Sequence, residues 1–175
     1  MNRRKIAFAS VYSALAIVIS PLYFQWGITK AFPGQHLINV LAGITLGPFW
    51  AVLVAFIVGT IRIMIGTGSF FAYPGGIPGG VVVGLSYIVL RKAIGREKAI
   101  LVSALMEPIG TVLVGGTISW FIVDPFTGRS MQLVFASILM LYFGWLASSL
   151  TGCILGAIVT ITLYRMGVLK IVFGE

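Results

Sequence analysis

Residues 99–123 read AILVSALMEPIGTVLVGGTISWFIV and contain a single charged side chain, Glu107. A helix that spans a bilayer needs about 20 mainly apolar residues, and this stretch meets that requirement. An ionisable residue inside such a stretch is costly, so it marks a candidate functional site. The stretch therefore predicts both a membrane-spanning helix and a polar position within it.

The rest of the chain has the same apolar character. Of its 175 residues, 59% are apolar and 9% are charged, and the mean hydropathy is +1.08. A soluble domain carries about 25% charged residues, so the composition excludes a soluble domain, a disordered tail and an ordinary nucleic-acid module. The length fits one transmembrane domain, residues 1–175. The fold class expected is an all-α integral membrane bundle of six transmembrane helices.

The six apolar segments differ in length. The first begins after a basic Met-Asn-Arg-Arg-Lys sequence and is expected to be a retained helix, because it is long for a signal peptide and no cleavage site is evident. The second and fourth are short and interrupted by Gly and Pro, and the last exceeds the bilayer thickness, so it must tilt or protrude. The segments are Ile6–Trp26, Leu37–Leu46, Phe49–Ile65, Ile77–Leu90, Ala99–Val123 and Leu133–Tyr164.

The basic residues predict the orientation. Cytoplasmic loops carry an excess of Lys and Arg, and placing the N-terminus inside gives a nine-to-three bias, with both termini cytoplasmic. The connections at Gly27–His36, Gly66–Gly76 and Asp124–Met131 are then external. The nine inside are Arg3, Arg4, Lys5, Arg91, Lys92, Arg96, Lys98, Arg165 and Lys170, and the three outside are Lys30, Arg62 and Arg129.

Candidate binding residues gather in the outer half of this arrangement. Ser103, Gly110 and Thr111 share the helical face of Glu107, which gives one polar stripe directed into the bundle. A Pro-Gly turn at 33–34 places Gln35, His36 and Asn39 at the external start of the second helix, where they donate and accept hydrogen bonds without fixed charge.

Two further features belong to the external end. Arg62 lies near the external end of the third helix, where it either reaches the interface or pairs with an acid or a substrate. The stretch Ser69–Gly76, with Phe71 and Tyr73, is expected to form an aromatic lid. A pocket of aromatic side chains with a few convergent polar groups suits a small, flat, mostly uncharged ligand. In it a ligand hydroxyl would donate to Glu107.

Small residues recur at every fourth position on several helices. They let helices approach closely in lipid, and the sets Gly76/Gly80/Gly84 and Gly144/Ser148/Gly152/Gly156 predict packing inside the bundle. On the first helix, the pairs Ala9/Ser13 and Ser10/Ala14 are explained equally well by packing inside the bundle and by docking of a partner membrane protein.

Catalysis has less support. His36 is the only imidazole, and no serine lies in a recognisable nucleophile setting, so we expect a protein that is not an enzyme. The single cysteine, Cys153, lies in an apolar run and is expected to pack there; no metal or cofactor is expected. A stand-alone channel or secondary carrier, and a membrane enzyme using His36 or Glu107, stay open as alternatives.

Three stretches carry a family resemblance: Ala31–Asn39, which includes Phe-Pro-Gly-Gln-His; Gly43–Pro48; and Gly66–Gly68 with Ala72–Gly75. With these residues, the chain resembles the substrate-binding S components of energy-coupling factor (ECF) vitamin transporters, and more narrowly the ThiW family. Tyr73 stands where that family usually has Phe.

The resemblance implies a function and partners. An S component in the cytoplasmic membrane captures its substrate outside, here the thiamin precursor 4-methyl-5-(2-hydroxyethyl)thiazole. It then docks on a membrane coupling protein, EcfT, which works with two cytoplasmic ATPases. Thiamin, its pyrimidine precursor or another small vitamin is the alternative substrate. The resemblance places the docking surface at Ala9, Ser10, Ser13 and Ala14, and ligand residues in the outer half.

Overall fold

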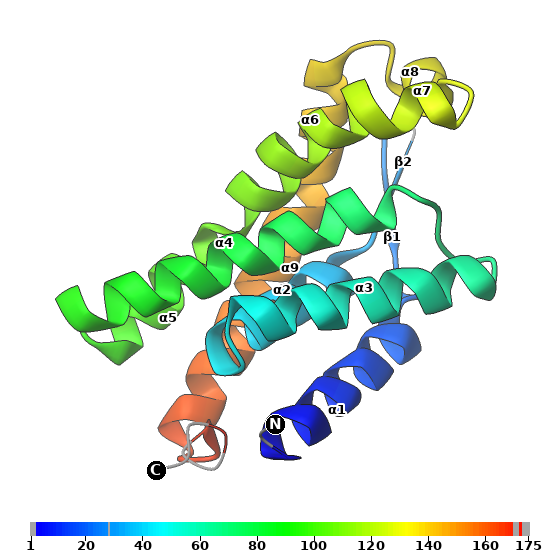
Figure 1. Ribbon diagram of the computed structural model, residues 1–175. Helices are drawn as coiled ribbons and strands as arrows, with labels where there is room; N and C mark the ends of the chain where they lie inside the picture. Colours follow the sequence, from blue (N-terminus) through cyan, green and yellow to red (C-terminus); the bar gives the residue numbers. More distant parts are fainter. Residues whose placement is uncertain (1–2, 28, 170–171, 173–175) are drawn as a thin grey trace.

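The computed structural model describes residues 3–27, 29–169 and 172, and its architecture is helical (Figure 1). The exception is a two-stranded antiparallel hairpin, in which Gln25 pairs with Lys30. The elements in order are α1 (Arg3–Ile19), β1 (Phe24–Trp26), β2 (Thr29–Ala31), α2 (Pro33–Thr45), α3 (Pro48–Met64), α4 (Ala72–Ala93), α5 (Arg96–Leu105), the π-helix η1 (Ile109–Gly115), α6 (Gly116–Ile118), the π-helix η2 (Ser119–Val123), α7 (Asp124–Phe126), α8 (Ser130–Phe135) and α9 (Ile138–Arg165).

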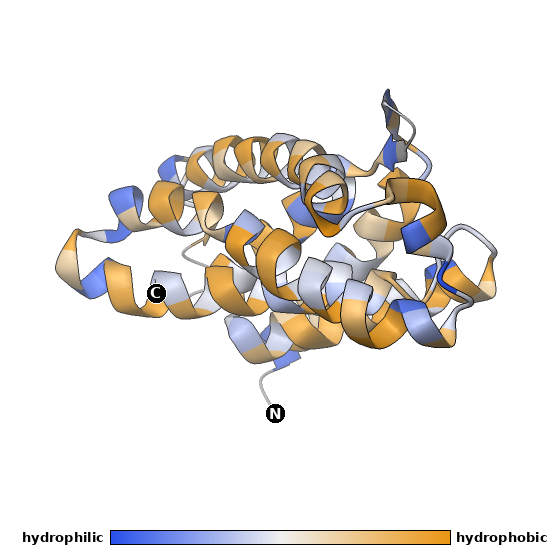
Figure 2. Ribbon diagram, turned by 90° about the horizontal axis from the view of Figure 1, so that it is seen from above, coloured by the Kyte–Doolittle hydropathy of each residue, from blue (hydrophilic) through white to orange (hydrophobic). Residues whose placement is uncertain are grey.

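Three helices in the described part of the chain are long and apolar enough to cross a membrane. They are α4, the continuous helical segment Arg96–Phe126 and α9, while α3 is a shorter apolar helix. Large apolar side chains such as Phe56, Phe121 and Phe143 are exposed on the outside of the bundle, and Figure 2 shows hydrophobic residues along the outward faces of the helices. Such a surface is stable in lipid rather than in water, so the fold is that of a membrane protein.

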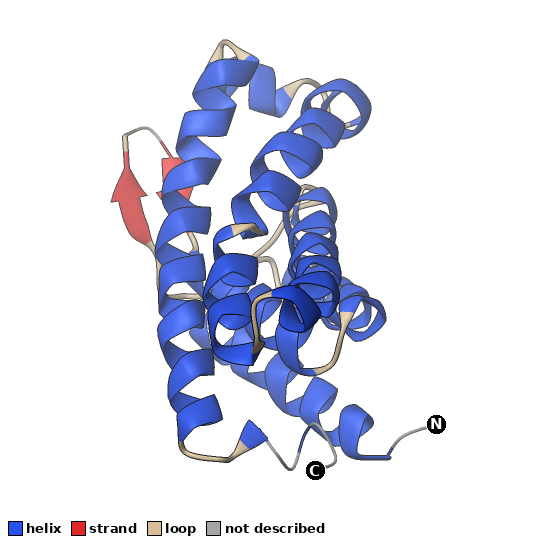
Figure 3. Cartoon of the chain, turned by 90° about the vertical axis from the view of Figure 1, so that its left-hand side faces the viewer, coloured by secondary structure: helices blue, strands red, loops and turns tan. Residues whose placement is uncertain are grey.

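The two ends of the bundle differ. The start of α1 and the end of α9 lie at one end, and the hairpin, α7 and α8 lie toward the other (Figure 1). The hairpin stands beside α9, outside the helices (Figure 3), and the backbone N–H of Phe32 donates to Ser148 Oγ of α9 at 2.8 Å. The start of α1, the end of α4, the start of α5 and the end of α9 carry the basic residues expected at the cytoplasmic side, and these helix ends lie toward the end of the bundle with the chain termini (Figure 1). Lys170 lies outside the described residues.

The predicted end of the first helix was wrong. The segment Ile6–Trp26 was expected to be one helix, but α1 ends at Ile19 and Phe24–Trp26 form strand β1. Pro21 explains the early end, because a proline disfavours helical backbone in the residue before it and has no N–H to donate.

Two helices begin earlier than expected, and each has a proline in its first turn: Pro33 in α2 and Pro74 in α4. Helix α2 begins at Pro33 rather than Leu37, and α4 begins at Ala72 rather than Ile77. Proline suits the first helical turn, where its missing N–H has no partner to lose. The external connection predicted as Gly66–Gly76 is therefore shorter, and the run around Gly75 is helical rather than a loop.

The last predicted segment, Leu133–Tyr164, is broken rather than continuous. Ala136 has φ +55° and ends α8, and Ser137 starts α9 by accepting a hydrogen bond from the N–H of Met140 at 3.3 Å. A non-glycine residue with positive φ interrupts the helical ladder, and a serine N-cap restarts it. From Ile138 the helix then continues through Ser148 and Gly152 without a break.

The small-residue stripes pack helices together, as predicted. A Cβ on Gly84 would lie 2.7 Å from the backbone N of Pro48, and one on Gly156 would lie 2.8 Å from Val40 Cβ. These distances are shorter than real Cβ contacts, so only glycine allows α4 to lie this close to α3, and α9 to α2. The predicted role of these stripes in internal packing is confirmed.

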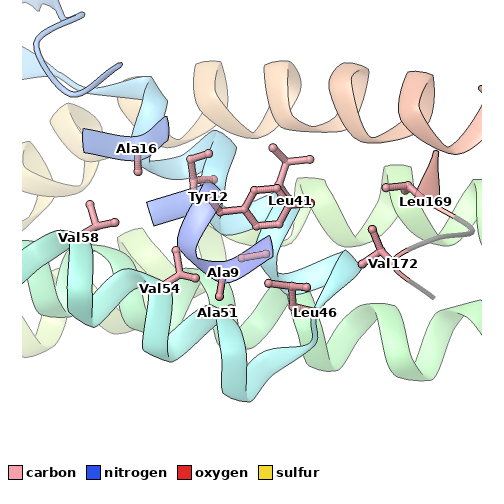
Figure 4. Close-up of a cluster of buried hydrophobic side chains, with 12 residues drawn as sticks. Ala9, Tyr12, Ala16, Leu41, Leu46, Ala51, Val54, Val58, Leu169 and Val172 are labelled. Carbon is pink, nitrogen blue, oxygen red and sulfur yellow. The ribbon is translucent and has the colours of Figure 1, made fainter. Parts of the chain in front are cut away.

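Half of the predicted docking surface on α1 is instead core. Ala9 and Ser13 are 5% and 6% exposed, and Figure 4 shows Ala9 directed toward α3 beside Ala51 and Val54. Their small side chains let α1 pack on the bundle, so they are not available to a partner while α1 stays in place. Ser10 and Ala14 lie on the exposed side of the helix.

Candidate functional site

A cavity of about 410 Å³ lies in the half of the bundle that carries the hairpin, α7 and α8. Helices α2, α3, α4, η1, α8 and α9 all contribute to its wall. Its lining combines aromatic side chains with neutral and basic polar groups. The residues are Lys30, Phe32, Gln35, His36, Arg62, Gly66, Thr67, Gly68, Ser69, Phe71, Ala72, Gly75, Thr111, Met131, Phe135, Gly144, Trp145 and Ser148.

The Glu107 carboxylate forms the centre of a buried polar network beneath this cavity. Glu107 is 0% exposed, and its Oε1 accepts from Asn39 Nδ2 at 2.9 Å and from Thr111 Oγ1 at 2.6 Å. His36 Nδ1 lies 3.0 Å from the same oxygen, and Ser149 Oγ donates to Oε2. A buried carboxylate is tolerated when its lone pairs are filled in this way, so Glu107 has its hydrogen-bond partners within the protein.

The helix that carries Glu107 changes its geometry directly after this residue. Pro108, which follows Glu107, has no N–H, and the π-helix η1 begins directly after it at Ile109. π-helical turns inside longer helices are frequent at functional sites. Opposite, Gly79 of α4 lies so close that a Cβ there would overlap Thr111 Oγ1 and Glu107 Oε1 and would lie 3.0 Å from Asn39 Nδ2.

The predicted residues thus separate into two layers. His36 and Thr111 line the cavity and also bond to Glu107, whereas Glu107 and Asn39 lie behind them. Within the described residues, no hydrogen bond involves the second ring nitrogen of His36. The ligand hydroxyl was expected to donate to Glu107 directly; the geometry instead makes His36 and Thr111 the groups at the cavity surface.

Arg62 is a buried cation in the cavity wall. It is 5% exposed; its Nη1 donates to Gln35 Oε1 at 2.8 Å and its Nη2 to the Thr67 carbonyl at 3.1 Å. Its guanidinium carbon lies 5.1 Å from the ring centre of Phe32, a distance typical of a cation–π interaction. Arg62 therefore ties α2 and the turn after α3 together beside the cavity, rather than reaching out to the membrane interface.

The two aromatic residues expected in the lid point in different directions. Phe71 is buried and lines the cavity. Tyr73 is directed away from it: its hydroxyl is 3.0 Å from Thr60 Oγ1, and its ring stacks on Phe56 at a centroid distance of 5.5 Å. Phe71 is the N-cap residue of α4 and Tyr73 lies in its first turn, so the two side chains leave the helix start in different directions. Tyr73 therefore lies on the outer surface between α3 and α4.

Sequence reasoning missed several lining residues. Trp145 and Phe135 line the cavity, as does Ser148. Ser149 donates a hydrogen bond to Glu107 in the network beneath it. The sequence did contain one signal, because Gly144 and Ser148 belong to the predicted packing stripe of α9. Trp145 and Ser149 each follow a stripe residue, so their direction depends on how α9 is rotated against α2.

Metal binding has no support in the described part of the chain, where no group of three His, Cys, Asp or Glu side chains lies close enough to hold an ion. Cys153 is buried and free, as a packing residue would be. Asp124 is also buried, but its carboxylate accepts from the backbone N–H of Met131 at 2.7 Å and of Gln132 at 3.2 Å. It therefore fixes the start of α8 rather than forming a site.

An apolar helical bundle with a polar, aromatic cavity in one half has the features of a membrane protein with a small-molecule site. The architecture matches a solved structure described as "Structure and mechanism of the S component of a bacterial ECF transporter", with a TM-score of 0.67 and 18% identity over 95% of this chain and 96% of that chain. The fold is therefore that of an S component.

The particular family follows from the sequence comparison. The model of the ThiW family, the thiamine-precursor transporter proteins, matches residues 6–166, and the chain belongs to this family. A comparison with curated proteins gives no match. Family and fold are those of a transporter component rather than an enzyme.

Proposed function

We propose that the protein is the substrate-binding S component of an ECF-type importer and that it captures 4-methyl-5-(2-hydroxyethyl)thiazole from outside the cell. Residues 1–175 form one domain with six transmembrane helices in the cytoplasmic membrane, and both termini are cytoplasmic. Family membership supports a thiamin precursor as the substrate class. The single observation that carries the site assignment is the cavity of about 410 Å³ above the Glu107 network.

The cavity suits this ligand in size and chemistry. Its volume lies in the lower part of the range of roughly 300–1,000 Å³ usual for small-molecule sites. Phe32, Phe71 and Trp145 offer faces and edges for a flat aromatic ring. Because the lining includes both donors and acceptors, the ring nitrogen and the hydroxyl group of the thiazole each find a partner.

Specific contacts follow from the two layers. The ring nitrogen of His36 that faces away from Glu107 and the hydroxyl of Thr111 contact the ligand, with Gln35 and Arg62 as further donors in the lining. Glu107 and Asn39 act as positioning residues, because they hold His36 and Thr111 without reaching the cavity. Tyr73 contributes through the packing of α4 on α3.

The binding test is calorimetry on the purified protein with three compounds: the hydroxyethylthiazole, the thiamin pyrimidine and whole thiamin. We expect the thiazole to bind most tightly. Tight binding of the pyrimidine or of thiamin without thiazole binding would move the assignment to that compound. Covalent change in the bound thiazole would show an enzyme instead.

The positioning role of Glu107 has its own variant and control. Glu107→Gln keeps the volume but replaces one acceptor oxygen with a donor amide, so one of the partners loses its acceptor; we expect about a tenfold weaker thiazole affinity, from a loss on the order of 1.5 kcal/mol. The control is Ser103→Ala, because Ser103 is equally buried one turn earlier and its hydroxyl has no partner among the described residues. Normal thiazole binding by Glu107→Gln would make Glu107 purely structural.

Energy for uptake must come from partners. We propose docking to an EcfT-type membrane protein that is coupled to two cytoplasmic ATPases; the likeness to an S component of an ECF transporter supports partnership with an ECF module. On α1 the available part of the expected docking surface is Ser10 and Ala14. Reconstitution in liposomes tests this: transport of thiazole by this chain alone would favour the stand-alone carrier.

A further inference from the structure

Arg62 lines the cavity with a positive charge whose described hydrogen-bond partners are all neutral. A guanidinium has five N–H donors, and two of them are used, by Gln35 Oε1 and by the Thr67 carbonyl. The Nε–H group is buried and has no hydrogen-bond partner among the described residues. The described neighbours of Arg62 therefore leave N–H donors unused at a buried cation.

The acidic residues of the described chain are engaged elsewhere. No described residue in the cavity lining is acidic. Glu107 is fully buried beneath the cavity and bonds to its own network. Both carboxylate oxygens of Asp124 accept from backbone N–H groups at the start of α8, and Glu97 accepts from Arg165 on the exposed surface. The fourth acid of the sequence, Glu175, lies outside the described residues.

The Arg62 side chain is held in place by the residues around it. A Cβ on Gly68 would lie 2.9 Å from Arg62 Cβ, so the turn after α3 packs directly on this side chain. The bonds to Gln35 and Thr67 and the ring of Phe32 fix the guanidinium itself. A buried charge without a counter-charge is costly in a membrane protein, and a fixed cation loses little freedom when an anion binds. A ligand with a negative charge would therefore gain affinity here.

The remaining lining suits a small ring that carries such a charge. Phe71 and Trp145 offer aromatic surface in the same cavity. Lys30, which is exposed, adds a second basic side chain to the lining. The volume of about 410 Å³ falls in the range usual for small-molecule sites, so a thiazole with a charged arm fits.

We propose that Arg62 binds an oxyanion on the arm of the ligand, so that the site takes a thiazole with a phosphate ester or a carboxylate there more tightly than the neutral alcohol. The planar N–H donors of a guanidinium match the oxygens of both groups. The inference rests on the proposed function for the thiazole ring, and it extends the substrate class from the neutral compound to anionic ones.

The experiment is calorimetry on the whole protein in a neutral detergent at one ionic strength. The three ligands are the hydroxyethylthiazole, its phosphate ester and 4-methylthiazole-5-acetic acid, which carries a carboxylate. The test variants are Arg62→Gln and Arg62→Lys, of which the second keeps the charge but loses the planar fork. The matched control is Arg129→Gln, which removes the same charge from an exposed residue between α7 and α8 that does not line the cavity.

We expect at least one anionic thiazole to bind the unmodified protein about tenfold more tightly than the neutral one, and the tighter of the two identifies the anionic group. Arg62→Gln should abolish this preference, and Arg62→Lys should reduce it to about threefold. Arg129→Gln should keep it within about twofold. A purely structural Arg62 would weaken all three ligands equally and leave the preference unchanged. Thermal unfolding shows which variants are folded, and Arg62→Lys decides if Arg62→Gln is not.

Neutral thiazole that binds the unmodified protein as tightly as both anions, or more tightly, overturns the inference and leaves the proposed function standing. A preference that is unchanged in the folded Arg62 variants, or that is lost equally in Arg129→Gln, also overturns it. Binding of an anionic thiazole without binding of the neutral one would refute the proposed neutral substrate and support this inference. Absence of binding by all three ligands would refute both.

Discussion

Adding one methyl group to Gly79 tests whether the network beneath the cavity depends on the close approach of α4. The methyl carbon of Gly79→Ala would overlap Thr111 Oγ1 and Glu107 Oε1, and it would lie 3.0 Å from Asn39 Nδ2. An ordinary contact needs at least 3.4 Å. Either α4 or the carboxylate must then move by about 1 Å, which tightly packed interiors do not absorb without strain.

The size of the effect follows from the bonds that such a shift lengthens. The bond from Thr111 Oγ1 to Glu107 Oε1 is 2.6 Å and that from Asn39 Nδ2 is 2.9 Å, so a movement of about 1 Å takes both out of bonding range. Hydrogen bonds to a charged group contribute about 1.5–3 kcal/mol each, so the loss of both is expected to cost about 3–6 kcal/mol. For a chain of this length that corresponds to a Tm lower by roughly 10 °C.

Thermal unfolding of the purified protein, followed by the intrinsic fluorescence of its tryptophans, measures this loss. The matched control is Gly75→Ala, one turn earlier on the same face of α4, where the new methyl carbon would meet Trp145 at 3.5 Å, an ordinary contact. If Gly79→Ala and Gly75→Ala melt together within about 2 °C, the close approach of α4 does not stabilise the network and the reasoning fails.

Four further variants test the cavity wall, the outer surface and the partner surface on α1. Arg62→Gln removes the donors to Gln35 and to the Thr67 carbonyl, and calorimetry should show thiazole affinity lower by about tenfold or more; unchanged affinity would separate Arg62 from the site. Tyr73→Phe loses only the hydroxyl contact on the outer surface, so the same measurement should give unchanged thiazole affinity and a stability loss of about 1 kcal/mol or less, whereas weaker binding would return Tyr73 to the site. Ser10→Trp and Ala14→Trp, on the exposed side of α1, should leave thiazole binding intact and abolish uptake in cells that contain the partners; normal uptake by both would place the docking surface elsewhere.

Much of the polar network could be predicted from helical periodicity. Thr111 follows Glu107 by one turn, and His36 and Asn39 are separated by three residues, so each pair shares a face of its helix. Helical periodicity does not show that these two faces meet across the bundle. The sequence indicated it only indirectly, because an unpaired Glu107 in the membrane would be costly and therefore needs partners on another helix. Ser149 escaped prediction because one residue of helix rotation decides whether it or Ser148 faces the carboxylate.

The errors in the fold have a common cause. Membrane-spanning segments were recognised from apolar runs, and an apolar run does not show where a helix ends. Tyr23–Trp26 is apolar and aromatic enough to extend the first helix, yet these residues belong to a hairpin, and Ala136 interrupts a run in which no Gly, Pro or charge marks a break. Conversely, the sequence pattern predicts loops at Pro33 and Pro74, whereas both residues lie in the first turn of a helix. Proline is favoured there because its missing N–H has no partner to lose.

The pairing of Glu107 changes what its burial implies for binding. Its carboxylate already accepts hydrogen bonds from Asn39, Thr111 and Ser149 and contacts His36, so the buried acid does not need a ligand in the cavity to satisfy it. The affinity for a ligand must then come from the aromatic wall and from the outward-facing groups of the network, not from relief of an unpaired charge. Since His36 and Thr111 share one carboxylate oxygen, a ligand that moves either side chain alters the bond to the other. The network therefore couples α2 to η1 at the cavity floor, and through Ser149 it extends that coupling to α9.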